Sequence, residues 1–191
     1  MVDAVPSAWV CRFAPLIRER GRALDLAAGG GRHTRLLLDM GFRVTAVDRD
    51  IAAVQPLAGE GCDIRALDLE VGANWPLGGD YDGIVVTNYL HRPLFAPIAA
   101  ALAPGGLLIY ETFALGNERF GRPRNPEFLL RRRELIDAFA MLTIVAFEEG
   151  EVSQPRPAVI QRIAAIAAPL GRLAELDPIR RQAGGEPAPA A

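Results

Sequence analysis

The sequence predicts an α/β fold in which helices cover both faces of a mainly parallel sheet. Three observations support this prediction. Short apolar runs alternate with helical segments along most of the 191 residues. A glycine turn follows the first apolar run, and the next run ends in an acid, Asp48, about twenty residues further on. This order of strand, glycine turn, helix and acidic strand end is typical of a nucleotide-binding unit.

The expected strands coincide with the apolar runs. Five of them lie at residues 23–26, 43–47, 64–67, 83–87 and 107–111, and two further apolar runs follow at 142–147 and 159–165. Helices are expected at 31–40, 95–102 and 132–139. The first of these helices stops before Gly41 and the second before Pro104, residues that commonly end helices.

The glycine turn, residues 29–31, narrows the class of ligand. Glycines let the backbone adopt positive φ and pass close to a ligand, and the following helix points its unpaired N–H groups at that ligand. A dinucleotide-binding unit has a later third glycine, whereas residues 32–34 here are Arg-His-Thr. Asp25 adds a carboxylate inside the first strand, which suits an ammonium or sulfonium better than a pyrophosphate. The pattern therefore disfavours an oxidoreductase that uses a nicotinamide dinucleotide.

Residues 25–31, DLAAGGG, resemble motif I of the class I S-adenosylmethionine-dependent methyltransferases, D-x-G-x-G-x-G, with Ala27 in place of the first glycine. Three further segments match the family in order: ALDLE at 66–70, YDGIVVTNYLH at 81–91 and LAPGGLLIYETF at 102–113. The resemblance implies a three-layer Rossmann-like sandwich. Its sheet would be mostly parallel and seven-stranded, with the antiparallel last strand inserted between the fifth and sixth.

The resemblance also implies S-adenosylmethionine as the cofactor. In the family pattern, Asp48 would accept the ribose hydroxyls, while Asp68 and Leu69 would hold the adenine. Asp25 would order the ammonium of the methionine part, above the turn glycines. The expected cofactor-binding residues are Asp25, Ala27, Gly29, Gly31, Asp48, Arg49, Asp68, Leu69 and Asn88.

The end of the expected fourth strand, residues 88–91, would face the methyl acceptor. DNA and protein amide methyltransferases carry Asn-Pro-Pro-Tyr there; this chain lacks both prolines, which disfavours an exocyclic-amine acceptor. His91 is the best-placed candidate base, with a helix-capping or surface histidine as the alternative. Either Tyr110 or Glu111 could also face the acceptor, because neighbours in a strand point to opposite sides. His33 is expected to face solvent.

Two other segments allow more than one interpretation. Trp9, Arg12 and Phe13 have helical spacing. By resemblance Arg12 would pair with the cofactor carboxylate, whereas an ordinary amphipathic helix would use Trp9 and Phe13 as core anchors. After the fifth strand, the arginine-rich loop 119–133 would suit an anionic acceptor or would simply be solvated.

Bulk properties favour one soluble domain. We expect residues 1–181 to form it and residues 182–191, rich in Gly, Pro and Ala, to be a frayed tail. A net charge of −2 gives no overall attraction to nucleic acid or anionic membranes. Cys11 and Cys62 are too few for a metal cluster, and we expect reduced thiols in the cytoplasm. No apolar run reaches the roughly eighteen residues of a membrane-spanning helix.

The expected function is therefore a cytoplasmic S-adenosylmethionine-dependent methyltransferase. Its small size and its strand ends most resemble the compact bacterial tellurite-resistance type, which implies a small acceptor such as a chalcogen oxyanion or a thiol. An RNA or protein methyltransferase and a non-catalytic S-adenosylmethionine-binding protein remain alternatives. Loop arginines beside a flat cofactor mouth would favour a macromolecule, and a deep apolar pocket would favour a small molecule. Residue patterns do not predict the oligomeric state.

Overall fold

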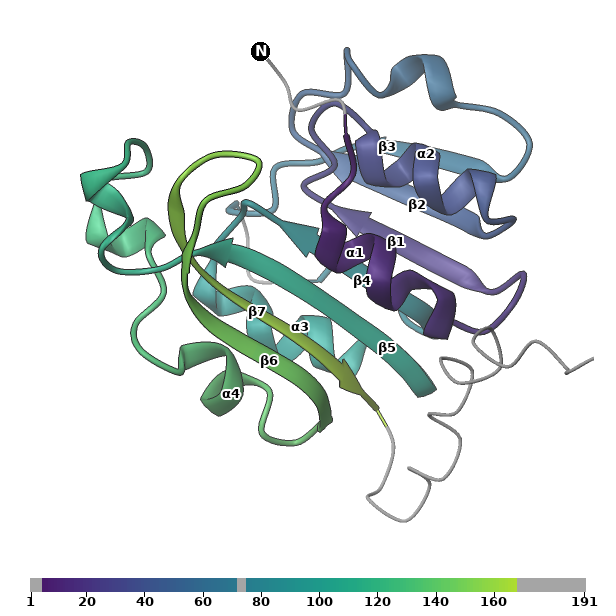
Figure 1. Ribbon diagram of the computed structural model, residues 1–191. Coiled ribbons are helices and arrows are strands. Elements are labelled where there is room, and N and C mark those ends of the chain that lie inside the picture. The colour runs from purple at the N-terminus through teal and green to yellow at the C-terminus, as the bar shows by residue number, and fades with distance from the viewer. Residues whose placement is uncertain (1–4, 72–74, 168–191) are drawn as a thin grey trace, which may run out of the picture.

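A seven-stranded sheet lies at the centre of a three-layer molecule (Figure 1). The computed structural model describes residues 5–71 and 75–167, so the expected tail at 182–191 lies outside the described residues. The strand order is β3-β2-β1-β4-β5-β7-β6. Strands β1 to β5 pair in parallel, and β7 lies antiparallel between β5 and β6. This arrangement confirms the expected fold class, including the antiparallel last strand.

The elements follow the expected alternation. The strands are β1 (Arg22–Leu26), β2 (Arg43–Asp48), β3 (Cys62–Ala66), β4 (Tyr81–Thr87), β5 (Leu102–Phe113), β6 (Thr143–Val152) and β7 (Ala158–Ile166). The helices are α1 (Ala8–Phe13), α2 (Arg32–Asp39), α3 (Phe95–Ala100) and α4 (Glu134–Ala138). Short 3-10 turns are η1 (Ala14–Leu16), η2 (Gln55–Leu57), η3 (Arg92–Leu94), η4 (Asn117–Arg119) and η5 (Pro126–Phe128).

The sheet separates two apolar layers. Helices α1 and α2 pack on one face, and α3 and α4 pack on the other (Figure 1). Strand β4 is buried along its whole length, and its successive residues point to opposite layers. Ile84 and Val86 pack toward α3 and α4, whereas Val85 packs toward α1 and α2. The central strands are therefore apolar on both faces, as parallel strands between two helical layers must be.

Helix α1 is an amphipathic helix anchored by aromatic residues. Trp9 and Phe13 are each 2% exposed. The Ser7 hydroxyl caps the helix by accepting a hydrogen bond from the Trp9 N–H at 3.1 Å. Arg12 lies over the Phe13 ring and pairs with Glu148 at 3.7 Å. Of the two interpretations of this segment, the amphipathic helix is confirmed.

Strand β5 is longer than the sequence pattern predicts. It starts at Leu102, which pairs with Tyr81, rather than at residue 107. The Pro-Gly-Gly segment inside β5 packs directly against β4. A Cβ on Gly106 would lie 2.6 Å from the carbonyl oxygen of Tyr81. Glycine at this position thus lets a turn-like sequence continue a strand.

The described residues contain neither a membrane-spanning helix nor a group of metal-binding side chains. None of their helices has the length and apolar character needed to cross a membrane. Nor do they contain three or more His, Cys, Asp or Glu side chains grouped closely enough to hold a metal ion. Cys11 is exposed and Cys62 is buried, and neither forms a disulfide.

Candidate functional site

The glycine turn between β1 and α2 forms the floor of the site. The angle φ is 57° at Ala27, 53° at Gly29 and 74° at Gly31, all in the left-handed region. For an alanine this conformation costs about 1–2 kcal/mol. A Cβ on Gly31 would lie 2.8 Å from Val54 Cγ2, so only glycine fits there without a shift. Gly31, the N-cap of α2, has no side chain to cap the helix, and the Thr34 N–H in its first turn interacts with the buried Asp25 carboxylate.

Asp48 at the end of β2 is fixed by two backbone donors. Its Oδ2 accepts a hydrogen bond from the Gly29 N–H at 2.8 Å, and its Oδ1 accepts one from the Asp50 N–H at 3.0 Å. A carboxylate oxygen has two acceptor positions, so each oxygen keeps one for a ligand. The carboxylate is thus oriented in advance for a pair of hydroxyl groups.

A pocket of about 580 Å³ opens above this floor, at the carboxyl ends of β1, β2 and β4; we call it the main pocket. Ligands of open α/β sheets bind at this edge. The turn supplies one wall, and Asp48 and Arg49 supply another. Residues 67–70 follow β3, and residues 87–89 end β4. Phe128 and Arg156 come from segments much later in the chain and complete the lining.

Asp25 lies under the turn rather than in the main pocket. It is 1% exposed, and its Oδ2 accepts a 2.6 Å hydrogen bond from the Thr34 hydroxyl in the first turn of α2. Burial raises the pKa of this carboxyl to about 6, against the opposing effect of Thr34. The pair ties β1 to the helix that follows it.

His33 is buried, and the expectation that it faces solvent is wrong. Only 1% of it is exposed. Its Nε2 accepts a 3.0 Å hydrogen bond from the Ser7 N–H, so the neutral ring carries its proton on Nδ1, which lies 3.3 Å from the Thr87 hydroxyl. Burial, assisted by the neighbouring Arg32 charge, lowers the His33 pKa to about 3. The ring also lines the main pocket.

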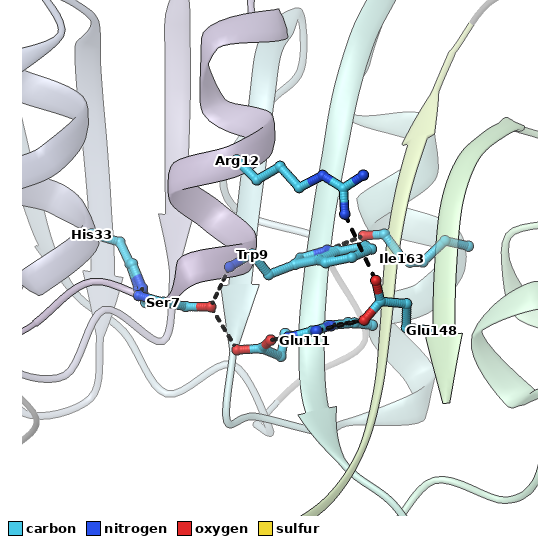
Figure 2. A network of polar contacts seen from close by, with 8 residues as sticks. Ser7, Trp9, Arg12, His33, Glu111, Glu148 and Ile163 are labelled. Atoms are coloured by element: carbon cyan, nitrogen blue, oxygen red, sulfur yellow. Dashed lines mark hydrogen bonds and ion pairs between the residues drawn. The ribbon is translucent and has the colours of Figure 1, made fainter. Parts of the chain in front are cut away.

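Ser7 connects this histidine to the other half of the sheet. Figure 2 shows Ser7 between His33 of α2 and Glu111 of β5. Its hydroxyl donates to Glu111 Oε1 at 2.8 Å, and Arg162 Nη1 donates to Glu111 Oε2 at 3.2 Å. Arg162 also donates from Nε to Glu148 at 2.9 Å. The chain before α1 is therefore fixed across the carboxyl edge of the sheet.

Tyr89 has a buried hydroxyl with no hydrogen-bond partner among the described residues. Burial raises its pKa well above the usual range, and the nearby charges of Glu70 and Asp68 act in the same direction. The phenol is therefore neutral, and Tyr89 is one of the residues that line the main pocket. An unpaired buried polar atom costs free energy, which a ligand that accepts from it would recover.

Arg92 holds the segment that carries Phe128. Its Nε donates to Glu134 at 2.6 Å, and its two terminal nitrogens donate to the carbonyl oxygens of Glu127 and Leu129 at 2.6 and 2.9 Å. Burial is the largest single influence on Glu134 and opposes its ionisation, but the hydrogen bonds from Arg92 and the Arg131 backbone, together with their charges, lower the Glu134 pKa overall. Phe128 lies between Glu127 and Leu129, whose carbonyl oxygens Arg92 binds. These bonds keep Phe128 at the rim of the main pocket although 49% of it is exposed.

A second pocket of about 390 Å³ adjoins the first; we call it the side pocket. Its walls are the chain before α1 (residues 5–7) with the first residue of α1, the end of β5 and the β6–β7 hairpin. Arg32, Asn88 and Arg156 line both pockets, so the two spaces meet at the end of β4.

Sequence comparison finds methyltransferases. No family model matches the chain. A protein-L-isoaspartate O-methyltransferase of Chlorobaculum tepidum is 28% identical over 149 residues, which are 73% of this chain and 68% of that protein. A ribosomal RNA small subunit methyltransferase H of Picosynechococcus is 39% identical over 75 residues, 36% of this chain and 26% of that protein.

Solved structures give the same answer at the level of fold. TehB from Haemophilus influenzae superposes with a TM-score of 0.68 at 18% identity, over 86% of this chain and 63% of TehB. The chain has the class I methyltransferase fold. A Burkholderia thailandensis 1,6-didemethyltoxoflavin-N1-methyltransferase, solved with S-adenosylhomocysteine bound, gives 0.66 at 24% identity over 87% and 79% of the two chains.

Within this methyltransferase fold, the main pocket brings together most of the expected cofactor residues. Its lining includes Ala27, Gly29, Asp48, Arg49, Asp68, Leu69 and Asn88. Asp25 and Gly31 lie beneath the floor and do not line the main pocket. His91 is half-buried at the start of η3 and lines neither the main pocket nor the side pocket.

Sequence reasoning did not place several contributors to the two pockets, among them Ser7, Arg32, His33, Phe128 and Arg156. Local patterns carry no signal for Ser7, His33 or Phe128, because hydrogen bonds to residues distant in the chain hold these residues or their neighbours. Ser7 and His33 are separated by 26 positions, and His33 and Thr87 by 54.

Proposed function

We propose that this chain transfers a methyl group from S-adenosylmethionine to a small organic molecule. The observation that supports this most directly is the Asp48 carboxylate, which two backbone N–H groups hold at the wall of the main pocket. Charge-assisted hydrogen bonds from a ribose to such a carboxylate contribute about 1.5–3 kcal/mol each. The methyltransferase relatives and the shared fold support the same cofactor.

The residues of the main pocket fit the parts of this cofactor. Leu67, Leu69 and Asp68 offer an apolar surface and an acceptor for the adenine. The unpaired Tyr89 hydroxyl offers a donor beside them. Arg32 lines the pocket, and we assign it to the methionine carboxylate. Arg12 does not take this role, because it lies over the Phe13 ring and pairs with Glu148. Asp25 acts indirectly in this proposal, by fixing Thr34 and the start of α2.

The protein's part in the reaction is mainly alignment. S-adenosylmethionine, when bound, supplies a methyl group that its sulfonium already activates. The chain must hold an acceptor in line with the carbon–sulfur bond and exclude water, and such alignment is worth about 7–11 kcal/mol. Asn88, which lines both pockets at the end of β4, is placed to orient the acceptor. The junction of the two pockets is where the acceptor atom would lie.

A small acceptor is favoured over a macromolecule. The arginines of loop 119–133 line neither pocket. Arg119 is instead paired with Glu151 at 2.6 Å and lies over the Phe120 ring. The solvated interpretation of this loop therefore fits its surroundings better than an RNA or protein contact. We also retain the cytoplasm as the expected compartment, consistent with unpaired Cys11 and Cys62.

Calorimetric titration tests the cofactor. We expect micromolar binding of S-adenosylmethionine and S-adenosylhomocysteine and no binding of nicotinamide dinucleotides, because the turn lacks the later third glycine of a dinucleotide-binding unit. Binding of a dinucleotide alone would refute the proposal.

The role of His91 as general base remains a prediction. The His91→Ala variant should bind S-adenosylmethionine as tightly as the wild type but turn over more slowly, if the histidine takes a proton from the acceptor. His91 lines neither pocket, so it could act as a base only after a movement of η3. The hydrogen bond from Arg92 to Glu134 opposes such a movement. Unchanged turnover, or an equal loss of binding and turnover, would remove His91 as a base.

A further inference from the structure

The side pocket has the enclosure of a small-molecule site. Its volume of about 390 Å³ lies within the range of about 300–1,000 Å³ typical of ligand pockets. One wall is the chain before α1, which Ser7 fixes to both His33 and Glu111 (Figure 2). The opposite wall is the β6–β7 hairpin. The pocket is therefore shaped by contacts that exist without a ligand.

The interior is mainly apolar. Phe113 at the end of β5, Ile160 on β7 and Val152 on β6 supply aromatic and aliphatic surface, and Pro6 supplies more from the N-terminal wall. A small inorganic oxyanion has no apolar surface to place against these side chains. The ligand that fits is an organic molecule with an apolar body.

Among the described residues, one carboxylate, Glu111, lines the side pocket, and its charge is already neutralised. Glu111 accepts hydrogen bonds from Ser7 and Arg162, and its side chain is only 14% exposed. Arg162 is in turn shared with Glu148 and lies over the Trp9 ring at 4.7 Å. A cationic ligand would therefore find no uncompensated negative charge in this lining.

Arg32, Asn88, Gln154 and Arg156 supply the other polar groups of the lining. Arg32 donates to the Val5 carbonyl oxygen at 3.2 Å and is assigned above to the methionine carboxylate, so Arg156 is the cation left for the acceptor. Arg156 lies on the β6–β7 hairpin and lines both pockets, so a group bound to it lies near the junction where the methyl would be transferred. Among the residues described, none is found paired with its guanidinium. A guanidinium fork binds carboxylates in a bidentate geometry and is always charged.

We propose that the side pocket binds the methyl acceptor, and that this acceptor is an organic anion whose apolar body contacts Phe113 and Ile160 while its anionic group meets Arg156. That the bound molecule is the methyl acceptor rests on the proposed function. This acceptor differs from the chalcogen oxyanion expected from sequence resemblance, because the pocket demands an apolar body.

Three probes with one skeleton test the charge preference: 3-phenylpropionate, 3-phenylpropan-1-ol and 3-phenylpropylamine. Each is titrated into the isotope-labelled full chain by NMR, with and without saturating S-adenosylhomocysteine. We expect the carboxylate to bind about tenfold more tightly than the amine, as one charge-assisted hydrogen bond implies. The Arg156→Gln variant should lose that preference. Arg124→Gln, a loop arginine that lines neither pocket, is the matched control and should keep it.

The outcomes separate this inference from the cofactor assignment. If S-adenosylhomocysteine does not bind, the proposed function fails, while the titrations without it still test the side pocket. If it binds but the amine binds as well as the carboxylate, or Arg156→Gln changes nothing, the organic-anion acceptor is refuted. An Ile160→Glu variant should block the carboxylate probe and leave S-adenosylhomocysteine binding intact; unchanged probe binding would show that the probe binds elsewhere.

Discussion

The residue Ala27 shows how one methyl group departs from the family pattern. It has a φ of 57° where motif I normally carries glycine. Replacing it with glycine removes about 1–2 kcal/mol of backbone strain but adds conformational entropy to the unfolded chain. The Ala27→Gly variant should therefore unfold with a free energy about 0.5–1 kcal/mol higher, as measured by urea denaturation. The turn thus keeps the left-handed conformation of the motif although alanine stands at its first glycine position.

The neighbouring Ala28 is the control for this prediction. It is 7% exposed and is not among the residues with positive φ. Ala28→Gly should lower the free energy of unfolding by about 0.5–1 kcal/mol. Equal effects of the two substitutions would show that backbone strain at Ala27 has no measurable cost.

Two buried ionisable residues should give opposite pH dependences. His33 has its pKa lowered to about 3, so the unfolded state takes up a proton first as pH falls below 6.5, and stability is lost from there downward. Asp25 has its pKa raised to about 6 from 3.8, so the folded state takes up a proton first, and stability is gained as pH falls through 6 toward 4. Each effect reaches at most about 1.4 kcal/mol per pH unit.

The variants His33→Gln and Asp25→Asn separate the two effects, and each is the control for the other. Between pH 6 and 4, the wild type should lose stability relative to His33→Gln and gain stability relative to Asp25→Asn. Denaturation curves at several pH values measure both differences. Parallel trends in the two variants would contradict the burial of one of these residues.

At the scale of elements, the sequence predicts more of the sheet than of the segments around it. Apolar runs locate all seven strands, and the family resemblance supplies the position of β7, which no local pattern contains. The segments that complete the pockets are harder to predict. Residues 5–7 and 126–134 are placed by hydrogen bonds to distant elements, such as Ser7 to Glu111 and Arg92 to Glu134.

The segment at 126–134 should depend on the Arg92–Glu134 pair. The two side chains are 27% and 16% exposed. Replacing Glu134 with Gln removes charge-assisted hydrogen bonds worth about 1.5–3 kcal/mol and frees the segment that holds Phe128. The stabilisation has its full value above the unfolded pKa of Glu134 and is lost as pH falls through the lowered folded pKa.

Glu151→Gln is the matched control, because it breaks the Arg119–Glu151 pair, whose side chains are 56% and 60% exposed. Exposed pairs contribute about 0.2–1 kcal/mol. Thermal denaturation at pH 7 compares the two variants. A loss at Glu151 as large as the loss at Glu134 would contradict the special role of the half-buried pair.

For the molecule as a whole, the proposed function depends on two pockets that meet at the end of the central strand. The βαβ geometry places Asp48 and the glycine turn on one side of the junction. The chain before α1 and the β6–β7 hairpin enclose a mainly apolar space on the other side. The methyl transfer that we propose, to an organic acceptor, requires this adjacency.

The calorimetric titration of S-adenosylhomocysteine into the wild type and into Asp48→Ala tests the central claim most directly. Asp50→Ala serves as the control, since Asp50 caps the turn at Ala52 and does not line the main pocket. The account predicts micromolar affinity for the wild type and for Asp50→Ala, and a loss of at least about tenfold in Asp48→Ala. Equal affinity in all three proteins would contradict the assignment of the main pocket to this cofactor.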